Sequence, residues 1–159
     1  MSATRAAFGL AVFIAVCFGA AFLGSVFTTG SIPVWYAKLN KPFWTPPNWV
    51  FGPVWSALYL MMAFAVWLVW RQAGLAAAAL PITLFALQLV LNLAWSGLFF
   101  GLHMPGAALA EIVVLWCAIL ATLLAFWRST PIAGILLLPY QLWVTFAAIL
   151  NFAIWRMNR

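Results

Sequence analysis

Residues 6–27 read AAFGLAVFIAVCFGAAFLGSVF and contain no charged side chain. At a rise of about 1.5 Å per residue, a helix of this length spans about 33 Å, enough to cross roughly 30 Å of bilayer hydrocarbon. Arg5 precedes the run, as a basic residue does in a secretory signal peptide. The apolar core of such a peptide has only about 7–15 residues, however. The run therefore predicts a retained first transmembrane helix.

Four more long apolar runs follow, each bounded by charged residues, glycine or proline. Together the five runs predict helices over about 6–28, 51–71, 77–100, 106–127 and 131–155. Hydrophobic residues make up 69% of the 159-residue chain and charged residues only 5%, whereas a soluble domain has about a quarter of its residues charged. We predict an all-α fold: one integral membrane domain over residues 1–159, a bundle of five transmembrane helices.

The basic residues stand singly near the ends of the apolar runs. This placement is typical of helix ends that meet lipid headgroups, so we expect membrane lipid as a partner and no nucleic acid. One end of the predicted bundle carries Arg5, Arg71 and Arg128, and the other carries Lys38, Lys41, Arg156 and Arg159. Three against four specifies the orientation weakly and favours a cytoplasmic long loop and C-terminus.

The one long connection, residues 29–50, reads TGSIPVWYAKLNKPFWTPPNWV. Its prolines predict a stiff, non-helical backbone. Two interpretations of its aromatic residues stay open. They would form an interfacial belt at headgroup depth, or they would cover a site below them.

Three predicted helices place aromatic and amide side chains at the end where this loop lies. These residues, each group sharing one helix side, are Trp55 and Tyr59; Gln88, Asn92, Trp95 and Ser96; and Tyr140, Trp143, Ala147 and Asn151. Amides in a membrane are costly unless they face the bundle interior, where they also bond neighbouring helices. Helix–helix bonding explains any one amide, but the joint pattern favours a ligand cavity lined by aromatic residues.

Several segments, in order along nearly the whole chain, resemble the tryptophan-rich sensory protein/translocator protein (TspO/MBR) family. The segments are WYAKLNKPFWTPP at 35–47, WVFGPVW at 49–55, NLAWS at 92–96, FFG at 99–101, PYQLW at 139–143 and LN at 150–151. The resemblance implies a five-helix bundle, usually a homodimer, that binds porphyrins such as protoporphyrin IX and isoquinoline- or benzodiazepine-type drugs under the first loop.

The resemblance also implies site residues. The ligand-binding candidates are Trp35, Tyr59, Asn92, Trp95, Trp116, Trp143, Ala147 and Leu150. In some bacterial members light-dependent porphyrin breakdown is attributed to two tryptophans, which match Trp55 and Trp143 here. The cholesterol motif of animal members is only approximated near the C-terminus, so we do not expect cholesterol as the natural ligand. The function is thus expected to be a porphyrin receptor or sensor, with a transporter of tetrapyrroles or lipid-like ligands as the alternative.

Other chemistry is poorly supported. With one Glu, one His and no Asp, a single chain cannot assemble a hydrolytic triad or a carboxylate pair, and we expect no metal site and no resident cofactor. His103 is expected at the interface, so a metal-free porphyrin is favoured. Glu111 suits the start of its helix, paired with Arg156, or alternatively serves as a proton or ligand contact. Lys38, Lys41 or a terminal arginine would meet the porphyrin carboxylates.

Two patterns of small residues bear on the expected dimer. Ala7, Ala11, Ala15 and Gly19 form a ridge on the first helix, and Gly97 and Gly101 form a GxxxG pair on the third. Such ridges let helix backbones approach closely. Packing within one bundle explains either ridge, while the resemblance points to the third helix for the dimer.

Overall fold

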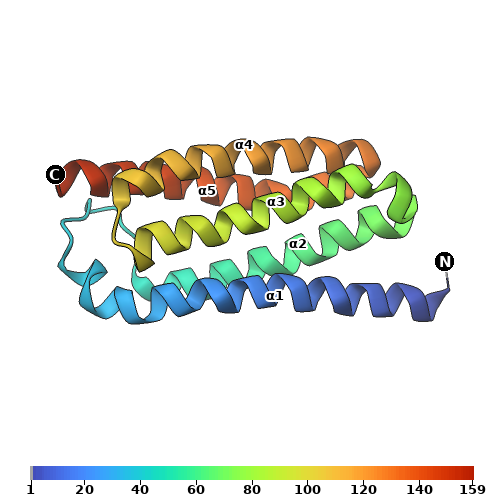
Figure 1. Ribbon diagram of the computed structural model, residues 1–159, viewed down its shortest axis with the longest axis horizontal. Coiled ribbons are helices and arrows are strands. Elements are labelled where there is room, and N and C mark those ends of the chain that lie inside the picture. Colours follow the sequence, from blue (N-terminus) through green and yellow to red (C-terminus); the bar gives the residue numbers. More distant parts are fainter. Residues whose placement is uncertain (1) are drawn as a thin grey trace.

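The apolar runs form five long helices in the computed structural model, which describes residues 2–159. The helices are α1 (Ala3–Val34), α2 (Asn48–Ala77), α3 (Ala79–Ser96), α4 (Pro105–Ser129) and α5 (Pro131–Met157), with a 3-10 turn η1 (Tyr36–Lys38) and a π-helical turn η2 (Gly97–Gly101) that continues α3. They lie side by side along the long axis of the molecule, with the two termini at opposite ends (Figure 1). No strand occurs within residues 2–159, so the predicted all-α bundle is confirmed.

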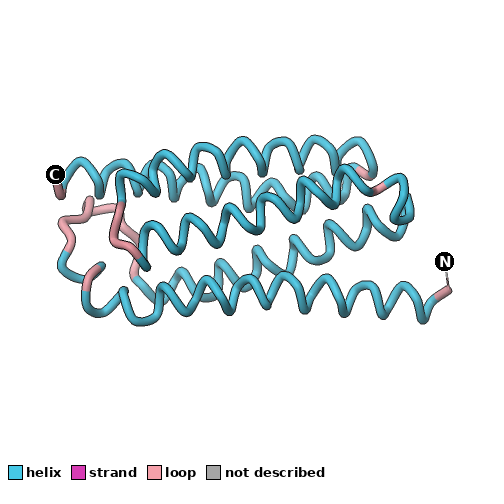
Figure 2. The backbone as a smooth tube through the Cα atoms, in the orientation of Figure 1, coloured by secondary structure: helices cyan, strands magenta, loops and turns pink. Residues whose placement is uncertain are grey.

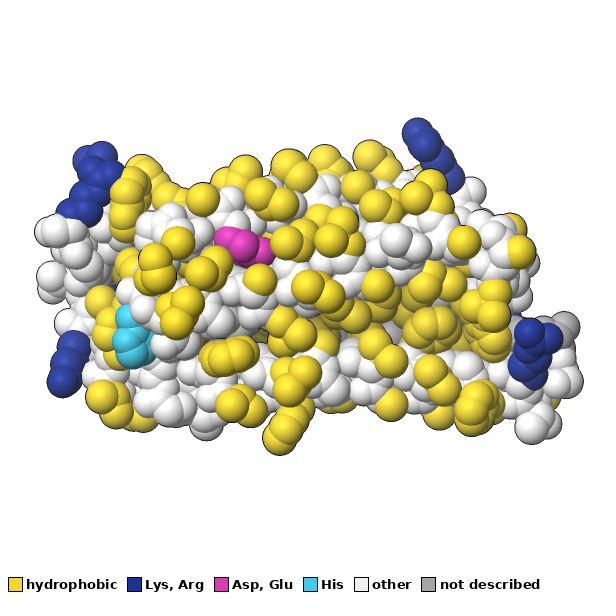
Figure 3. Space-filling model, viewed as in Figure 1, with side chains coloured by type: hydrophobic (Ala, Val, Ile, Leu, Met, Phe, Trp, Pro, Cys, Tyr) yellow, Lys and Arg dark blue, Asp and Glu magenta, His cyan; other side chains and the backbone are white. Residues whose placement is uncertain are grey.

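All five helices are long and apolar enough to span a membrane, counting η2 with α3. Figure 3 shows apolar side chains over the middle of the visible face and basic side chains at its two ends. The acidic side chain lies alone among apolar ones, and His103 lies towards one end. This distribution fits a multi-pass integral membrane protein, as the composition predicted.

The first connection is shorter than predicted. The structure has α1 helical through Val34 and α2 helical from Asn48, so the connection covers 35–47 instead of 29–50 and contains the short turn η1 (Figure 2). The polar stretch around Thr28 looks like a helix end, but its hydroxyls are bonded within the helix. Ser25 Oγ donates to the Phe22 carbonyl, and the hydroxyls of Thr28 and Thr29 both donate to the Ser25 carbonyl. Residues whose hydroxyls are bonded in this way can remain in a helix inside a membrane.

The second connection is also shorter than predicted. We predicted that the helix ends at 71, but α2 continues to Ala77 and is interrupted at Gly74, whose φ of 74° lies in the left-handed region that glycine adopts readily. α3 then begins directly after Ala78. The turn therefore contains almost no free loop.

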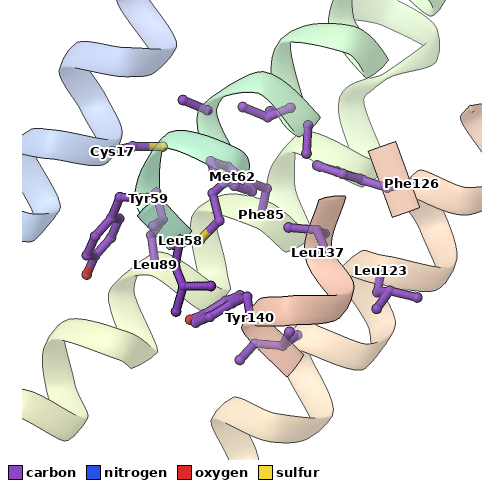
Figure 4. Packing of buried hydrophobic residues seen from close by; sticks show 14 of the residues in the cluster. Cys17, Leu58, Tyr59, Met62, Phe85, Leu89, Leu123, Phe126, Leu137 and Tyr140 are labelled. Atoms are coloured by element: carbon purple, nitrogen blue, oxygen red, sulfur yellow. The ribbon is translucent and has the colours of Figure 1, made fainter. Parts of the chain in front are cut away.

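The core fills the space between the helices over most of their length. Cys17 of α1, Met62 of α2 and Phe85 of α3 are each at most 3% exposed. Tyr59 and Tyr140 belong to the same cluster, and Figure 4 shows both among buried apolar side chains. At the end of the bundle where residues 35–47 lie, the helices are less tightly filled and enclose a cavity.

Candidate functional site

A cavity of about 520 Å³ lies beneath residues 35–47, which we call the lid loop. This volume falls within the range of about 300–1,000 Å³ that small-molecule sites occupy. The lining residues come from α1, α2, α3, η2, α5 and the lid loop, and α4 contributes none. From α1 they are Phe18, Ala21, Phe22, Gly24, Ser25, Thr28, Thr29 and Ile32, and from α2 they are Asn48, Phe51, Gly52, Trp55, Ser56 and Tyr59. The others are Tyr36, Asn92, Trp95, Ser96, Phe99, Phe100, Trp143, Phe146, Ala147, Leu150, Asn151 and Ile154.

Aromatic rings from α2 and α5 support one another along the cavity wall. The ring of Trp143 lies 6.0 Å from Phe51 and 5.5 Å from Phe146, measured between centroids. Trp55 lies 5.7 Å from Tyr59 by the same measure. Trp55 and Trp143 both line the cavity, so indole rings from two helices border it.

A chain of four polar side chains forms the deep end of the cavity. Tyr59 donates its hydroxyl to Asn92 Oδ1 at 2.9 Å, and Asn92 Nδ2 donates to the Tyr140 hydroxyl at 2.9 Å. Tyr140 in turn donates to Gln88 Oε1 at 2.9 Å. All four side chains are buried, and only Tyr59 and Asn92 line the cavity. A connected network of this kind links α2, α3 and α5 and fixes the orientation of the two lining groups.

A second polar contact lies closer to the lid loop. Trp95 Nε1 donates to Asn151 Oδ1 at 3.1 Å, and Asn151 Nδ2 donates to the Pro105 carbonyl at 2.8 Å. The carbonyl belongs to the first turn of α4. Asn151 therefore joins α3, α4 and α5 at the end of the bundle where the cavity lies.

The lid loop is held down at several points. Asn40 and Asn158 form a pair of hydrogen bonds, with the Asn40 N–H donating to Asn158 Oδ1 at 3.0 Å and Asn158 Nδ2 donating to the Asn40 carbonyl at 2.9 Å. The ring of Trp44 lies 5.9 Å from Phe146 of the cavity wall. Tyr36 is 3% exposed beneath the loop, and burial raises the pKa of its phenol to about 12. The loop is thus held at two points: Asn40 bonds Asn158, the residue that caps α5, and Trp44 packs against Phe146 of α5.

None of the lining residues carries a charge. Lys41, which we expected to meet ligand carboxylates, instead donates to the carbonyls of Tyr36 at 2.7 Å and Leu39 at 2.9 Å. Its ammonium stabilises the lid loop and does not face the cavity. Lys38 and the terminal arginines are likewise absent from the lining. The cavity is built for an uncharged, largely apolar surface.

Known proteins are similar to this chain over nearly its whole length, including the residues that line the cavity. The family model described as TspO/MBR family matches residues 13–156. The chain belongs to the TspO/MBR family. It is 44% identical to the tryptophan-rich protein TspO of Chlorobaculum tepidum, over 94% of this chain and 95% of that protein. It is 42% identical to the human translocator protein over 86% and 82% of the two chains, and 38% identical to the tryptophan-rich sensory protein of Cereibacter sphaeroides over 92% and 89%.

The structure brings together most of the positions that the TspO/MBR resemblance implied. The positions that line the cavity are Trp55, Tyr59, Asn92, Trp95, Trp143, Ala147 and Leu150. Trp35 and Trp116 do not line the cavity. Trp35 stacks on His103 with centroids 4.4 Å apart and faces a shallow groove between α1 and η2. Trp116 lies on α4, where its Nε1 donates to Thr145 Oγ1 at 2.8 Å.

Sequence reasoning missed the contribution of α1. Phe18, Phe22, Ser25, Thr28 and neighbouring residues form one whole side of the cavity. The small polar residues at 25, 28 and 29 were the available signal, since hydroxyls are uncommon in an otherwise apolar span. The predicted loop began at residue 29, whereas the structure keeps Thr29 in α1 on the cavity side.

Glu111 lacks its expected partner Arg156. Within residues 2–159 both carboxylate oxygens are buried and lack a hydrogen-bond partner. The expected pairing with Arg156 is therefore not formed. In the same range no group of three His, Cys, Asp or Glu side chains lies close enough to hold a metal ion.

Proposed function

We propose that this TspO/MBR protein is a membrane receptor or sensor that binds flat tetrapyrroles of the protoporphyrin IX type. Related hydrophobic ligands, including isoquinoline- and benzodiazepine-type compounds, would occupy the same place. One observation carries the proposal: an uncharged, aromatic-walled cavity of about 520 Å³ lies beneath a fastened lid. Indole and phenyl faces stack on flat conjugated rings, and the Tyr59–Asn92 pair supplies an oriented polar group.

Binding is tested by titrating the protein in lipid nanodiscs with protoporphyrin IX and following the porphyrin absorbance. The double variant Trp143→Ala, Tyr59→Ala removes two aromatic lining groups. At about 0.5–1.5 kcal/mol for each lost aromatic contact, the affinity falls by about 5- to 150-fold. Trp49→Phe is the matched control, because Trp49 lies at the same end but is 74% exposed and outside the lining. Equal affinity in the double variant and the control would reject this cavity as the site.

A photochemical activity is the second part of the proposal. Trp55 and Trp143 both line the cavity, so a porphyrin bound there would lie against two indoles. An indole would transfer one electron to the photoexcited porphyrin, leaving an indole radical cation and a porphyrin radical anion. Illumination of the complex tests this step through the loss of porphyrin absorbance. Bleaching at the same rate in the Trp55→Phe, Trp143→Phe variant would remove both residues from the reaction.

Transport of tetrapyrroles or lipid-like ligands is the alternative function. The name of the human relative, translocator protein, supports it. Proteoliposomes separate the two functions, because a receptor binds porphyrin without moving it. Porphyrin flux that requires Trp143 would favour transport, and saturable binding without flux would favour the receptor.

A further inference from the structure

The first half of α1 packs against α2. A side chain at Gly9 would overlap the indole of Trp70, so the two helices are in close contact there. The ring of Phe13 also lies 6.0 Å from Trp70, and Trp67 Nε1 donates to the Ala6 carbonyl at 2.8 Å. These contacts join residues near the start of α1 to the second half of α2.

The second half of α1 packs against a different partner. A Cβ placed on Gly24 would lie 3.7 Å from Ser96 Oγ of α3, and one placed on Gly101 would lie 3.0 Å from Phe27 Cδ1. Further along, Ser31 Oγ lies 2.9 Å from His103 Nε2 in the link after η2. α1 therefore crosses from α2 to α3 along its length.

The crossing leaves the cavity open between the second half of α1 and the first half of α2. Residues that line the cavity on both sides of this opening are exposed at the molecular surface: Phe18, Phe22, Ser25 and Thr29 on α1, and Asn48, Gly52 and Ser56 on α2. Phe22 is 69% exposed, and a Cβ on Gly52 would meet no atom within 4 Å. We call this opening the α1–α2 portal.

The portal lies at membrane depth. Phe22 is about 18 Å from the end of α1 at Val34, at about 1.5 Å per residue along a membrane-spanning helix. Much of the portal consequently faces lipid hydrocarbon. The route from water is covered by the lid loop, which the Asn40–Asn158 hydrogen bonds fasten to α5.

The portal also has a polarity that suits one form of ligand. The hydroxyls of Ser25 and Thr28 donate to carbonyls of their own helix, so their oxygens keep only the capacity to accept. No charged residue lines the portal or the cavity. An un-ionised carboxylic acid fits this lining, because it can donate its O–H and needs no cation. A carboxylate would enter a low-dielectric site with no partner.

We propose that ligands enter and leave the cavity from the bilayer through the α1–α2 portal, in uncharged form. The proposal rests on the ligand-binding function proposed above and specifies its substrate class: amphiphilic, flat molecules that first partition into lipid. The lid loop then serves as a fixed cover and not as the gate.

Stopped-flow mixing of nanodisc-embedded protein with protoporphyrin IX tests the route. Gly52→Phe and, separately, Ser56→Phe place a ring in the portal. Gly19→Phe is the matched control, because Gly19 is also exposed with open space around it but lies outside the cavity lining. Asn158→Ala unfastens the lid loop without touching the portal.

We expect each portal variant to slow both association and dissociation, with association slowed by a factor of about ten, equivalent to about 1.4 kcal/mol on that barrier. Gly19→Phe and Asn158→Ala should keep the original rates. The proposal would be overturned if both portal variants kept the rates of the unmodified protein. It would also be overturned if Asn158→Ala were the one variant that changed the rates, by speeding exchange, which would assign entry to the lid loop. An absence of saturable binding in the unmodified protein would instead overturn the proposed function, so the two failures are distinguishable.

Discussion

The hydrogen bond between Tyr59 and Asn92 allows a quantitative test of how the cavity is held in shape. Both side chains are buried, and Asn92 makes two side-chain bonds of 2.9 Å, one accepted from Tyr59 and one donated to Tyr140. The perturbation is a double-mutant cycle of Tyr59→Phe and Asn92→Leu. Tyr59→Phe removes only the hydroxyl, and Asn92→Leu removes both bonds while keeping a side chain of similar length.

The expected magnitudes follow from these bonds. Interhelical hydrogen bonds in membranes contribute on average about 0.6 kcal/mol each, with a maximum of about 1.7. Asn92→Leu loses two of them, about 1.2 kcal/mol, and leaves the Tyr59 hydroxyl buried without an acceptor, which adds about 1–3 kcal/mol. Its total cost is then about 2–4 kcal/mol. Tyr59→Phe should be destabilising alone but neutral or stabilising when Asn92 is already Leu.

Unfolding in mixed micelles of increasing SDS fraction, followed by circular dichroism, measures the four free energies of the cycle. We expect a coupling energy of about 1.6–3.6 kcal/mol between the two substitutions, the sum of the lost bond and the unpaired-hydroxyl penalty that Tyr59→Phe removes when Asn92 is Leu. Thr83→Val combined with Asn92→Leu is the control pair. The Thr83 hydroxyl bonds only within α3, to the Ala79 carbonyl, so these two effects should add. A Tyr59–Asn92 coupling no larger than that of the control pair would refute the reasoning.

Three further outcomes are expected. Gly9→Leu should destabilise the bundle by about 1–3 kcal/mol in the same SDS titration, because the new side chain would overlap Trp70. In porphyrin titrations Trp116→Phe should leave the affinity unchanged while Trp143→Phe weakens it, because only the latter residue lines the cavity. Burial raises the pKa of Tyr36 from its usual 10.0 to about 12, so its contribution to lid stability is complete below pH 10 and lost as the pH rises through about 12. Near-ultraviolet circular dichroism should show this alkaline loss in the unmodified protein and not in Tyr36→Phe.

The number and order of the helices could be predicted because a membrane imposes one dominant requirement. Each span must carry about 20 apolar residues, and each of the five runs does. The helix ends were less predictable, since the residues that mark them also occur inside membrane helices. Pro33 lies within α1, and the nearby threonines bond their own helix, so a stretch with the composition of a loop is helical.

The candidate site was predictable where polarity marks one side of a helix. Asn92 and Asn151 stand out in apolar spans, and both line the cavity. α1 gives a weaker signal, because its cavity face carries only the hydroxyls of Ser25, Thr28 and Thr29 and no amide. Trp116 shows the converse limit. An aromatic residue on a membrane helix is compatible with a cavity, a neighbouring helix or lipid, and its partner Thr145 becomes visible only in three dimensions.

Small residues decide the path of α1 and therefore the access to the cavity. Gly9 brings the start of α1 against Trp70 of α2, while Gly97 and Gly101 of η2 make room for Phe27 of α1. The GxxxG pair that we considered for a dimer thus has a role within one bundle. Because the two sets of contacts lie on different helices, tightening one does not close the space between α1 and α2. The α1–α2 portal is accordingly a consequence of helix crossing, and it would persist with the lid loop fully fastened.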